Sequence, residues 1–240
     1  MKNNPDDKRF KQTGVGSLRR PGVTLLELMI GIVIIVVLAA LSLPLARKMN
    51  GAAEAATCMS NVRQVGGAIL MYAGDNHQRL PPLQPAFDRE LGKRPPIWTV
   101  YLANKGYLWD GVGTLPCGTG VWTCPSCDFM SDAYGGYGVV EGSIFVYEEM
   151  RPEGVREPGS LRLNRIKRPA STWLVGDTSP SADELNKGWY ALWPNPSRWS
   201  GHGPAARHGG KVNVCMADGH AEALTVREIA EREITFDVIR

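Results

Sequence analysis

One long apolar segment near the N-terminus constrains this 240-residue chain more than any other feature. It runs from Val23 to Ala46, and the only charged side chain in these 24 residues is Glu27. About 20 apolar residues in a helix cover the roughly 30 Å hydrocarbon layer of a bilayer. A carboxylate within that layer is costly unless it finds a partner. The segment therefore predicts one membrane-spanning helix with a functional acidic residue near its start.

A cleaved secretory signal peptide is the simplest alternative for such a segment. The apolar region of a signal peptide has about 7–15 residues and ends in a cleavage site of small residues. The segment in this chain is longer and contains Glu27. We therefore expect any cleavage to lie before the apolar run.

Basic residues are concentrated before this segment. Residues 1–22 hold six of the 27 basic and two of the 24 acidic side chains, which leaves 21 basic and 22 acidic side chains for the remainder. Because basic residues favour the cytoplasmic side of a membrane, this asymmetry predicts a cytoplasmic leader and an extracytoplasmic remainder. The basic excess belongs to the leader, so it gives no reason to expect nucleic-acid binding.

The residues around Gly22 resemble a known processing site. Residues 22–28, Gly-Val-Thr-Leu-Leu-Glu-Leu, are similar to the cleavage and methylation site of type IV prepilins and type II secretion pseudopilins. The resemblance implies that a prepilin peptidase cuts after Gly22 and that Val23 becomes the N-methylated first residue. Val23 departs from the phenylalanine that is usual there. Glu27 and Pro44 match the acidic residue and the helix-kinking proline of that family.

The resemblance also implies partners and a place in the cell. We expect a single-pass protein of the bacterial inner membrane, with a cytoplasmic N-terminus and a periplasmic or extracellular C-terminal domain. Its partners are then the prepilin peptidase, an inner-membrane assembly platform, and other pilin or pseudopilin subunits in a homo- or hetero-filament. Glu27 of one subunit is expected to pair with the free Val23 amine of a neighbour. The alternative is that Glu27 contacts only its own helix or the lipid interface.

The expected fold is α+β and pilin-like. Beyond the membrane segment, apolar residues recur every three or four positions, which predicts one helix of about 75–80 Å that ends near Gly74. Its second half is amphipathic and packs on a small antiparallel β-sheet domain with long loops, where Gly66 and Gly67 permit close packing. The predicted divisions are a leader at 1–22, a transmembrane segment at 23–46, an amphipathic half-helix at 47–76, and a β-rich domain at 77–240.

A β-hairpin is the clearest element of the C-terminal part. Residues 211–216 and 220–224 are the predicted strands, and Asp-Gly between them supplies the positive φ that a tight turn needs at Gly219. A further strand is expected at 172–177. Thr225 is expected to cap a short C-terminal helix.

The spacing of His208, Asp218 and Gly219 resembles the His-x9-Asp-Gly processing-associated motif of many pilin-like proteins. Two interpretations of its role stay open. In the structural one, His208 bonds across the sheet and Asp218 shapes the turn. In the other, His208 and Asp218 bind a metal or ligand together with His220 and Asp177.

The cysteines allow several interpretations. Cys117 can form a disulfide with Cys124 or Cys127, because an extracytoplasmic compartment permits it. The second choice is a structural zinc held by these three cysteines and either Cys215 or a histidine. A Cys-x-x-Cys redox activity ranks third, and Cys58 is expected to be a buried free thiol. No cofactor is predicted beyond such a candidate zinc or a calcium ion, and no run of acidic calcium ligands is present.

Three function classes follow. The leading one is a structural subunit of a type II secretion pseudopilus or type IV pilus-like filament, which is not an enzyme. The second is a minor tip or surface protein whose tryptophan-rich loop at 189–199 binds carbohydrate or a secreted protein, although core filling is the preferred explanation of those tryptophans. The weakest is a membrane-anchored enzyme, because no motif places a nucleophile, a base and an orienting group. Its candidate residues are Cys124, Cys127, His202, His208 and Asp218.

Overall fold

The structure is a computed structural model, and it describes residues 22–84, 97–108, 120–128, 136–146 and 161–235. The chain divides into two compact units, residues 1–46 and 47–240, and each is described by itself. Cys117 and most of the predicted leader lie outside the described residues.

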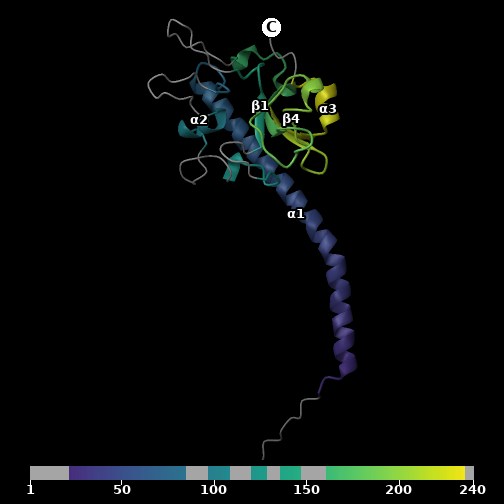
Figure 1. Ribbon diagram of the computed structural model, residues 1–240. Coiled ribbons are helices and arrows are strands. Elements are labelled where there is room, and N and C mark those ends of the chain that lie inside the picture. The colour runs from purple at the N-terminus through teal and green to yellow at the C-terminus, as the bar shows by residue number, and fades with distance from the viewer. Residues whose placement is uncertain (1–21, 85–96, 109–119, 129–135, 147–160, 236–240) are drawn as a thin grey trace, which may run out of the picture. The chain divides into compact units, whose positions relative to one another are not determined.

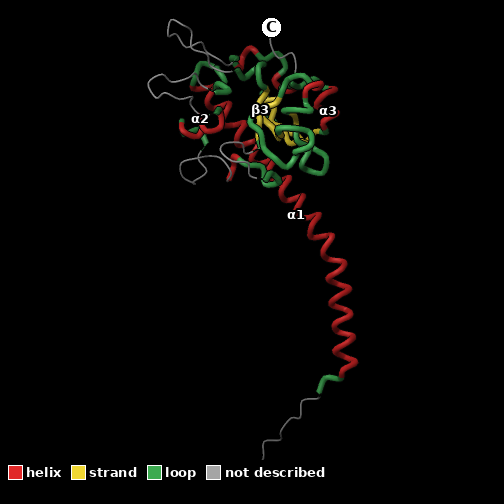
Figure 2. Tube along the Cα trace, in the orientation of Figure 1, coloured by secondary structure: helices red, strands yellow, loops and turns green. Residues whose placement is uncertain are grey.

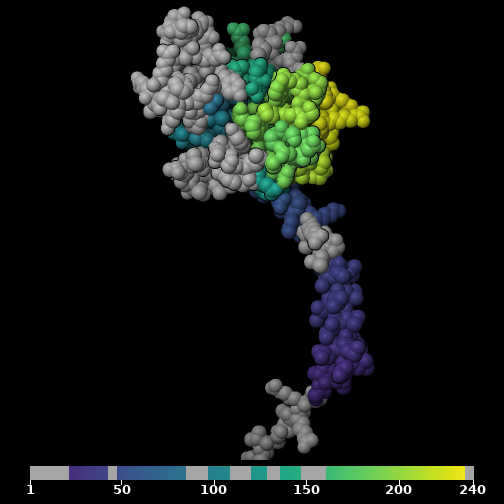
Figure 3. Space-filling model, in the orientation of Figure 1, coloured from purple at the N-terminus to yellow at the C-terminus, as the bar shows by residue number. Residues whose placement is uncertain are grey.

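Helix α1, Leu25–Asp75, is the longest element, and it confirms the predicted helix to within about two residues at each end (Figures 1 and 2). Its backbone is helical through Pro44. In the first unit, the stretch Leu25–Ser42 is long and apolar enough to cross a membrane, and none of it is buried. Figure 3 shows these residues in purple, as a rod whose side chains are exposed. Such a surface needs lipid or other helices around it.

The second unit is built on a small mixed sheet with the strand order β3-β1-β2-β5-β6, in which β4 pairs with β2. This sheet and the long helix give the α+β architecture that the sequence predicts. The other described helical segments are short: α2 (Trp98–Asn104), η1 (Gly120–Trp122), η2 (Leu163–Arg165), η3 (Pro169–Ser171), η4 (Pro196–Arg198) and α3 (Val226–Glu231). The strands are β1 (Tyr137–Val140), β2 (Trp173–Ser179), β3 (Ala191–Leu192), β4 (Gly203–Pro204), β5 (Val212–Met216) and β6 (Ala221–Leu224).

The predicted antiparallel sheet is a mixed sheet in the structure, because one pair of strands is parallel. Strand β3 runs parallel to β1, with Val139 opposite Ala191, whereas the other pairs of named strands are antiparallel. Parallel neighbours need a long connection, and the chain between β1 and β3 includes the whole of β2. A strand of two residues is too short to show an alternation of apolar and polar side chains. The direction of β3 therefore depends on that connection.

The strand β5 separates two hydrophobic layers. Val212, Val214 and Met216 face one core cluster, which also contains Ile229 of α3. Cys215 points to the opposite side, into the core cluster that includes the second half of α1. This alternation is the period of two expected for a strand with both faces covered.

Helix α1 packs closely against the sheet at Gly66. A Cβ atom at this position would lie 2.4 Å from Cys215 Sγ and 3.1 Å from Cys215 Cβ. At Gly67 a Cβ would meet nothing within 4 Å. The predicted role of glycine in close packing is therefore confirmed for Gly66 and is wrong for Gly67, because the neighbouring position turns away from the sheet.

The hairpin and the capped C-terminal helix are confirmed. Strands β5 and β6 pair antiparallel across a turn in which Gly219 has a φ of +92°. Thr225 Oγ1 accepts a hydrogen bond from the Glu228 amide at 3.2 Å, and the Glu228 carboxylate accepts one from the Thr225 amide at 2.8 Å. This reciprocal capping box fixes the start of α3, which lies on the surface of the second unit (yellow in Figure 3).

Candidate functional site

The bond between Gly22 and Val23 lies in non-helical backbone just before α1. Both residues are exposed, and Val23 keeps 76% of its surface open. A peptidase needs an extended and accessible substrate segment, because a helical peptide bond is held by its own hydrogen bonds. The Gly22–Val23 bond therefore lies outside the hydrogen-bonded backbone of α1.

Thr24 and Glu27 form a capping box at the start of α1. Glu27 Oε2 accepts hydrogen bonds from the Thr24 amide at 2.8 Å and from Thr24 Oγ1 at 2.9 Å. Thr24 Oγ1 in turn accepts from the Glu27 amide at 3.2 Å. The signal for this box was present in the sequence as Thr-x-x-Glu before an apolar run, and our sequence analysis missed it. In this single chain, Glu27 contacts its own helix.

A second site lies inside the second unit. Four buried side chains, one from each of four separate segments, direct their donor atoms toward a common centre. All four donor atoms lie within 4.8 Å of one another. We call this set the four-residue cluster, and its members are Cys58, Cys124, Asp177 and His208.

The contacts within the four-residue cluster are short. Cys58 Sγ lies 3.2 Å from Asp177 Oδ1, and Cys124 Sγ lies 3.3 Å from His208 Nε2. His208 Nε2 also lies 3.4 Å from Asp177 Oδ2. One nitrogen of the imidazole therefore faces both a sulfur and a carboxylate, while the other nitrogen, Nδ1, has no hydrogen-bond partner among the described residues.

The helix and the sheet bring two of these residues together. Cys58 stands four residues before Val62 and seven before Val65, so it belongs to the buried stripe of α1 that packs on the sheet. Asp177 stands two residues after Val175 on β2, so both point to the α1 side of the sheet. The same periodicity that builds the core thus places a thiol opposite a carboxylate.

A tight turn positions the third member, His208. Gly209 and Gly210 both have positive φ, +62° and +81°, as in the two-residue turns that join neighbouring strands. His208 and Lys211 exchange backbone hydrogen bonds across this turn at 3.2 Å. The turn aims the imidazole back into the core, where its side chain is 2% exposed.

Asp177 also has polar contacts with residues outside the four-residue cluster. Its Oδ2 accepts a hydrogen bond from the Asn213 amide at 2.9 Å, and its Oδ1 lies 3.4 Å from Arg207 Nη1. Arg207 also donates to the carbonyl oxygens of Gly136 and Lys187, at 3.2 and 2.7 Å. A buried carboxylate requires such a counter-charge, and Arg207 supplies it.

The neighbouring groups shift the pKa values within the four-residue cluster in opposite directions. A hydrogen bond with Cys58 is the main cause that lowers the pKa of Cys124 to about 6, and the same contact raises the pKa of Cys58. Burial acts to lower the pKa of His208, but its contacts with Asp177 and Cys124 outweigh burial and raise that pKa to about 9. These shifts favour a thiolate at Cys124 and a protonated imidazole at His208.

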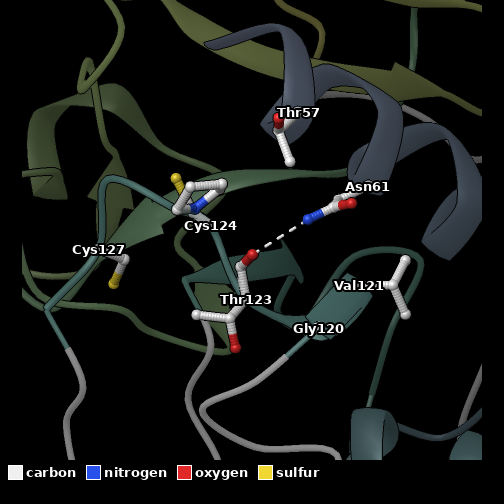
Figure 4. Close-up of a pocket in the computed structure, with 8 residues that line it drawn as sticks. Thr57, Asn61, Gly120, Val121, Thr123, Cys124 and Cys127 are labelled. Atoms are coloured by element: carbon white, nitrogen blue, oxygen red, sulfur yellow. Dashed lines mark hydrogen bonds between the residues drawn. The ribbon is translucent and has the colours of Figure 1, made fainter. Parts of the chain in front are cut away.

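Cys127, the second cysteine of the Cys-x-x-Cys pair, does not join the four-residue cluster. Figure 4 shows the sulfur atoms of Cys124 and Cys127 pointing in different directions. Burial raises the pKa of the Cys127 thiol to about 11. The described cysteines Cys58, Cys124, Cys127 and Cys215 are all free thiols, and the predicted pairing through Cys117 falls outside the described residues.

A surface pocket of about 580 Å³ lies beside Cys124, and Figure 4 shows the residues that line it. Helix α1 contributes Thr57 and Asn61 to its lining, and the 120–127 segment contributes the other side. Asn61 Nδ2 donates to the Thr123 carbonyl oxygen at 3.2 Å and so joins the two walls. Cys124 is the member of the four-residue cluster that lines this pocket.

The His-x9-Asp-Gly spacing is explained by a strand with a turn at each end. His208 precedes β5 and contacts the four-residue cluster, whereas Asp218 follows β5 and contacts His220. Asp218 Oδ1 accepts from the His220 amide at 3.1 Å and lies 2.6 Å from His220 Nδ1. The metal interpretation that joined His208 with Asp218 and His220 is therefore wrong in its ligand set, because these groups lie at opposite ends of the strand.

The remaining candidate residues pack against other side chains of the second unit. Burial raises the pKa of Cys215 to about 12, and its sulfur packs against α1. His202 lies with its ring centroid 4.5 Å from that of Trp189 and 5.8 Å from that of Trp193. Trp199 Nε1 donates to the Trp193 carbonyl oxygen at 2.8 Å. These aromatic side chains pack mainly on one another, as core filling beneath a loop requires.

Comparison with known proteins gives one match. Residues 18–43 match the family model described as the prokaryotic N-terminal methylation motif. No curated protein and no solved structure matches the chain. The match supports a type IV pilin-like protein, and it implies processing by a peptidase and assembly with other pilins. Together with the apolar helix, it is consistent with single-pass membrane anchoring.

Proposed function

We propose that this protein is a structural subunit that is cleaved after Gly22, N-methylated at Val23, and assembled through its N-terminal helix into a type II secretion pseudopilus or type IV pilus-like filament. The observation that carries the proposal is the exposed Gly22–Val23 bond directly before a fully exposed apolar helix, within the segment that matches the methylation motif. Before assembly, the helix spans the inner membrane with the leader on the cytoplasmic side.

Glu27 serves in two successive contacts in this proposal. In the single chain, its Oε2 atom caps the helix together with Thr24. Each carboxylate oxygen can accept two hydrogen bonds, so Oε1 is available to a second partner. Cleavage creates that partner, because the new Val23 amine of a neighbouring subunit is a cation at the membrane boundary. The pairing reduces the cost of both charges and fixes the stagger between subunits.

The processing step is tested by the intact mass of the protein extracted from the membrane. The expected N-terminus is Val23, with or without one methyl group. Gly22→Glu is the matched variant, since a large charged residue at the cleavage position should leave the leader in place. A wild-type chain that keeps its leader, or that is cut elsewhere, contradicts the proposal.

The role of Glu27 is tested with two variants that separate its contacts. Glu27→Gln keeps an acceptor for the capping box but removes the charge, and Thr24→Ala removes the cap but keeps the charge. We expect Glu27→Gln to reduce filament incorporation strongly and Thr24→Ala to leave it near the wild-type level. The reverse order would show that Glu27 acts only on its own helix.

A structural rather than catalytic role extends to the four-residue cluster. In a catalytic triad, one imidazole nitrogen faces the nucleophile and the other faces the carboxylate. Here Cys124 and Asp177 both face Nε2 of His208. Cys124 lines the pocket, but its side chain is fully buried and presents no exposed surface to a substrate. This arrangement supports our proposal that the protein is not an enzyme.

A further inference from the structure

We propose that the four-residue cluster binds one structural zinc ion, with two sulfur, one nitrogen and one oxygen ligand. The ligands are Cys58 Sγ, Cys124 Sγ, His208 Nε2 and one carboxylate oxygen of Asp177. This site is independent of the proposed filament role, since all four residues belong to the second unit.

The spacing of the donor atoms fits a tetrahedral ion. Zinc lies about 2.3 Å from sulfur, about 2.0–2.1 Å from nitrogen and about 2.0–2.2 Å from oxygen, so unlike ligands around it are about 3.4–3.6 Å apart. The observed separations are 3.2 Å for sulfur and oxygen, 3.3 Å for sulfur and nitrogen, and 3.4 Å for nitrogen and oxygen. For these three pairs, shifts of a few tenths of an ångström would admit the ion, and all four donor atoms lie within 4.8 Å of one another.

The direction of the imidazole also fits a ligand. His208 Nε2 faces Cys124 and Asp177 at once, although a single nitrogen makes only one good hydrogen bond at a time. A metal ion at the centre replaces these competing contacts by one bond to each donor atom. Binding through Nε2 requires the proton on Nδ1, which is the usual tautomer when that nitrogen ligates zinc.

The charges of the site balance when zinc is bound. Arg207 and Asp177 already neutralise each other in the core. With zinc bound, Cys58 and Cys124 are thiolates and His208 is neutral; the protons that these groups held go to solvent, and the two thiolates then neutralise the dication. The loaded core carries no net charge from these groups, which is the condition for burying so many ionised atoms.

The donor set selects zinc among common metals. Two thiolates, an imidazole and a carboxylate suit a tetrahedral, borderline-soft ion. Calcium prefers six to eight oxygen ligands and magnesium an octahedron of oxygens, so neither fits two sulfurs. A disulfide between Cys58 and Cys124 is the competing state, but it would leave His208 Nε2 and Asp177 without their sulfur contacts.

Zinc at this position would join segments that are far apart in the sequence. It would tie α1 to the 120–128 segment, to strand β2, and to the turn before β5. The 120–128 segment contains little regular structure besides η1, so few backbone hydrogen bonds hold it. A metal cross-link supplies the stability that such a segment lacks.

The experiment measures metal bound to the full processed chain, extracted in mild detergent and passed through a desalting column without chelator. We expect about one zinc per chain and a lower midpoint of thermal unfolding after a strong chelator removes it. X-ray absorption at the zinc edge should show two sulfur and two nitrogen or oxygen neighbours, and this readout needs no variant.

Matched variants assign the ligands. Cys58→Ser and His208→Ala should lose the zinc, whereas Cys215→Ser and Cys127→Ser should keep about one ion per chain. Cys215 is the closest control for Cys58, because both are fully buried thiols of the α1 side of the core. Arg207→Met, which removes the group that orients Asp177, should weaken zinc binding about 10- to 100-fold without abolishing it.

Several results would overturn the proposal. One is a wild-type chain without metal that has free thiols at Cys58 and Cys124. Another is a disulfide between these two cysteines in peptide mapping. A zinc neighbourhood of four sulfurs, or zinc retained by Cys58→Ser but lost by Cys127→Ser, would instead assign the ion to the Cys-x-x-Cys pair.

Discussion

Replacing Gly66 by alanine should destabilise the second unit, and replacing Gly67 should stabilise it. Both residues lie in the same turn of α1, so alanine improves helix propensity equally, by about 0.8–1.0 kcal/mol. They differ in what the new methyl group meets. At Gly66 it would overlap Cys215 Sγ at 2.4 Å, and at Gly67 it would enter open space.

The magnitude follows from the difference between the two variants. Because the propensity gain is common to both, the difference isolates the cost of overpacking, which is about 1–3 kcal/mol in protein cores. The upper half of that range is expected, since Cys215 Cβ is also close, at 3.1 Å, and is fixed by its own strand. Gly66→Ala should therefore lose about 1–2 kcal/mol relative to the wild type after its propensity gain is included.

Chemical denaturation of the full chain in detergent, followed by tryptophan fluorescence, measures this difference. All seven tryptophans lie at or beyond Trp98, so the signal reports only on the second unit. Cys215→Ala provides the control, because removing Sγ should recover part of the cost of Gly66→Ala in the double variant. A Gly66→Ala chain as stable as the Gly67→Ala chain would refute the close approach of α1 to β5.

Thr225→Ala removes the cap of α3 and should lower the free energy of unfolding by about 0.5–2 kcal/mol in the same assay; a loss below this range would mean that α3 is held by packing alone. His202 gives a prediction about pH, because burial lowers the pKa of its imidazole. Its contribution to stability is therefore present above the unfolded-state pKa near 6.5 and is lost as the pH falls below it. Stability should fall less on acidification in His202→Gln, and its imidazole resonances in the wild type should titrate below about 6.5. A midpoint above that value would contradict its burial.

Elements defined by short-range rules were predictable from the sequence. The hairpin followed from one Asp-Gly pair, and the start of α3 from a Thr-x-x-Glu pattern. Both rules act within a few residues, so distant parts of the chain do not alter them. The same rule applies at Thr24 and Glu27, where the resemblance to a processing site drew our attention to the charge of Glu27 and away from its capping contact.

Features that depend on the arrangement of distant segments were not predictable in this way. The parallel pairing of β3 depends on a connection that includes β2, and two residues carry no pattern that reveals their direction. The role of His208 depends on the Gly209–Gly210 turn, which the sequence analysis passed over in favour of the spacing to Asp218. The spacing between His208 and Asp218 reflects the length of β5 and not a contact between these two residues.

The four-residue cluster shows which signal could have located a site of this kind. Cys124 drew attention because Cys127 lies close in sequence, yet its spatial partner is Cys58, 66 positions earlier. Cys58 continues the stripe of Val62, Val65 and Ile69 on α1, so the helical period already placed its thiol on the face that packs against the sheet. A thiol on that face must meet strand residues of the sheet, and Asp177 is the acidic residue on the facing strand β2. Helical and strand periodicity, applied to polar residues as well as apolar ones, therefore predicts the contact that the spacing of cysteines in the sequence does not.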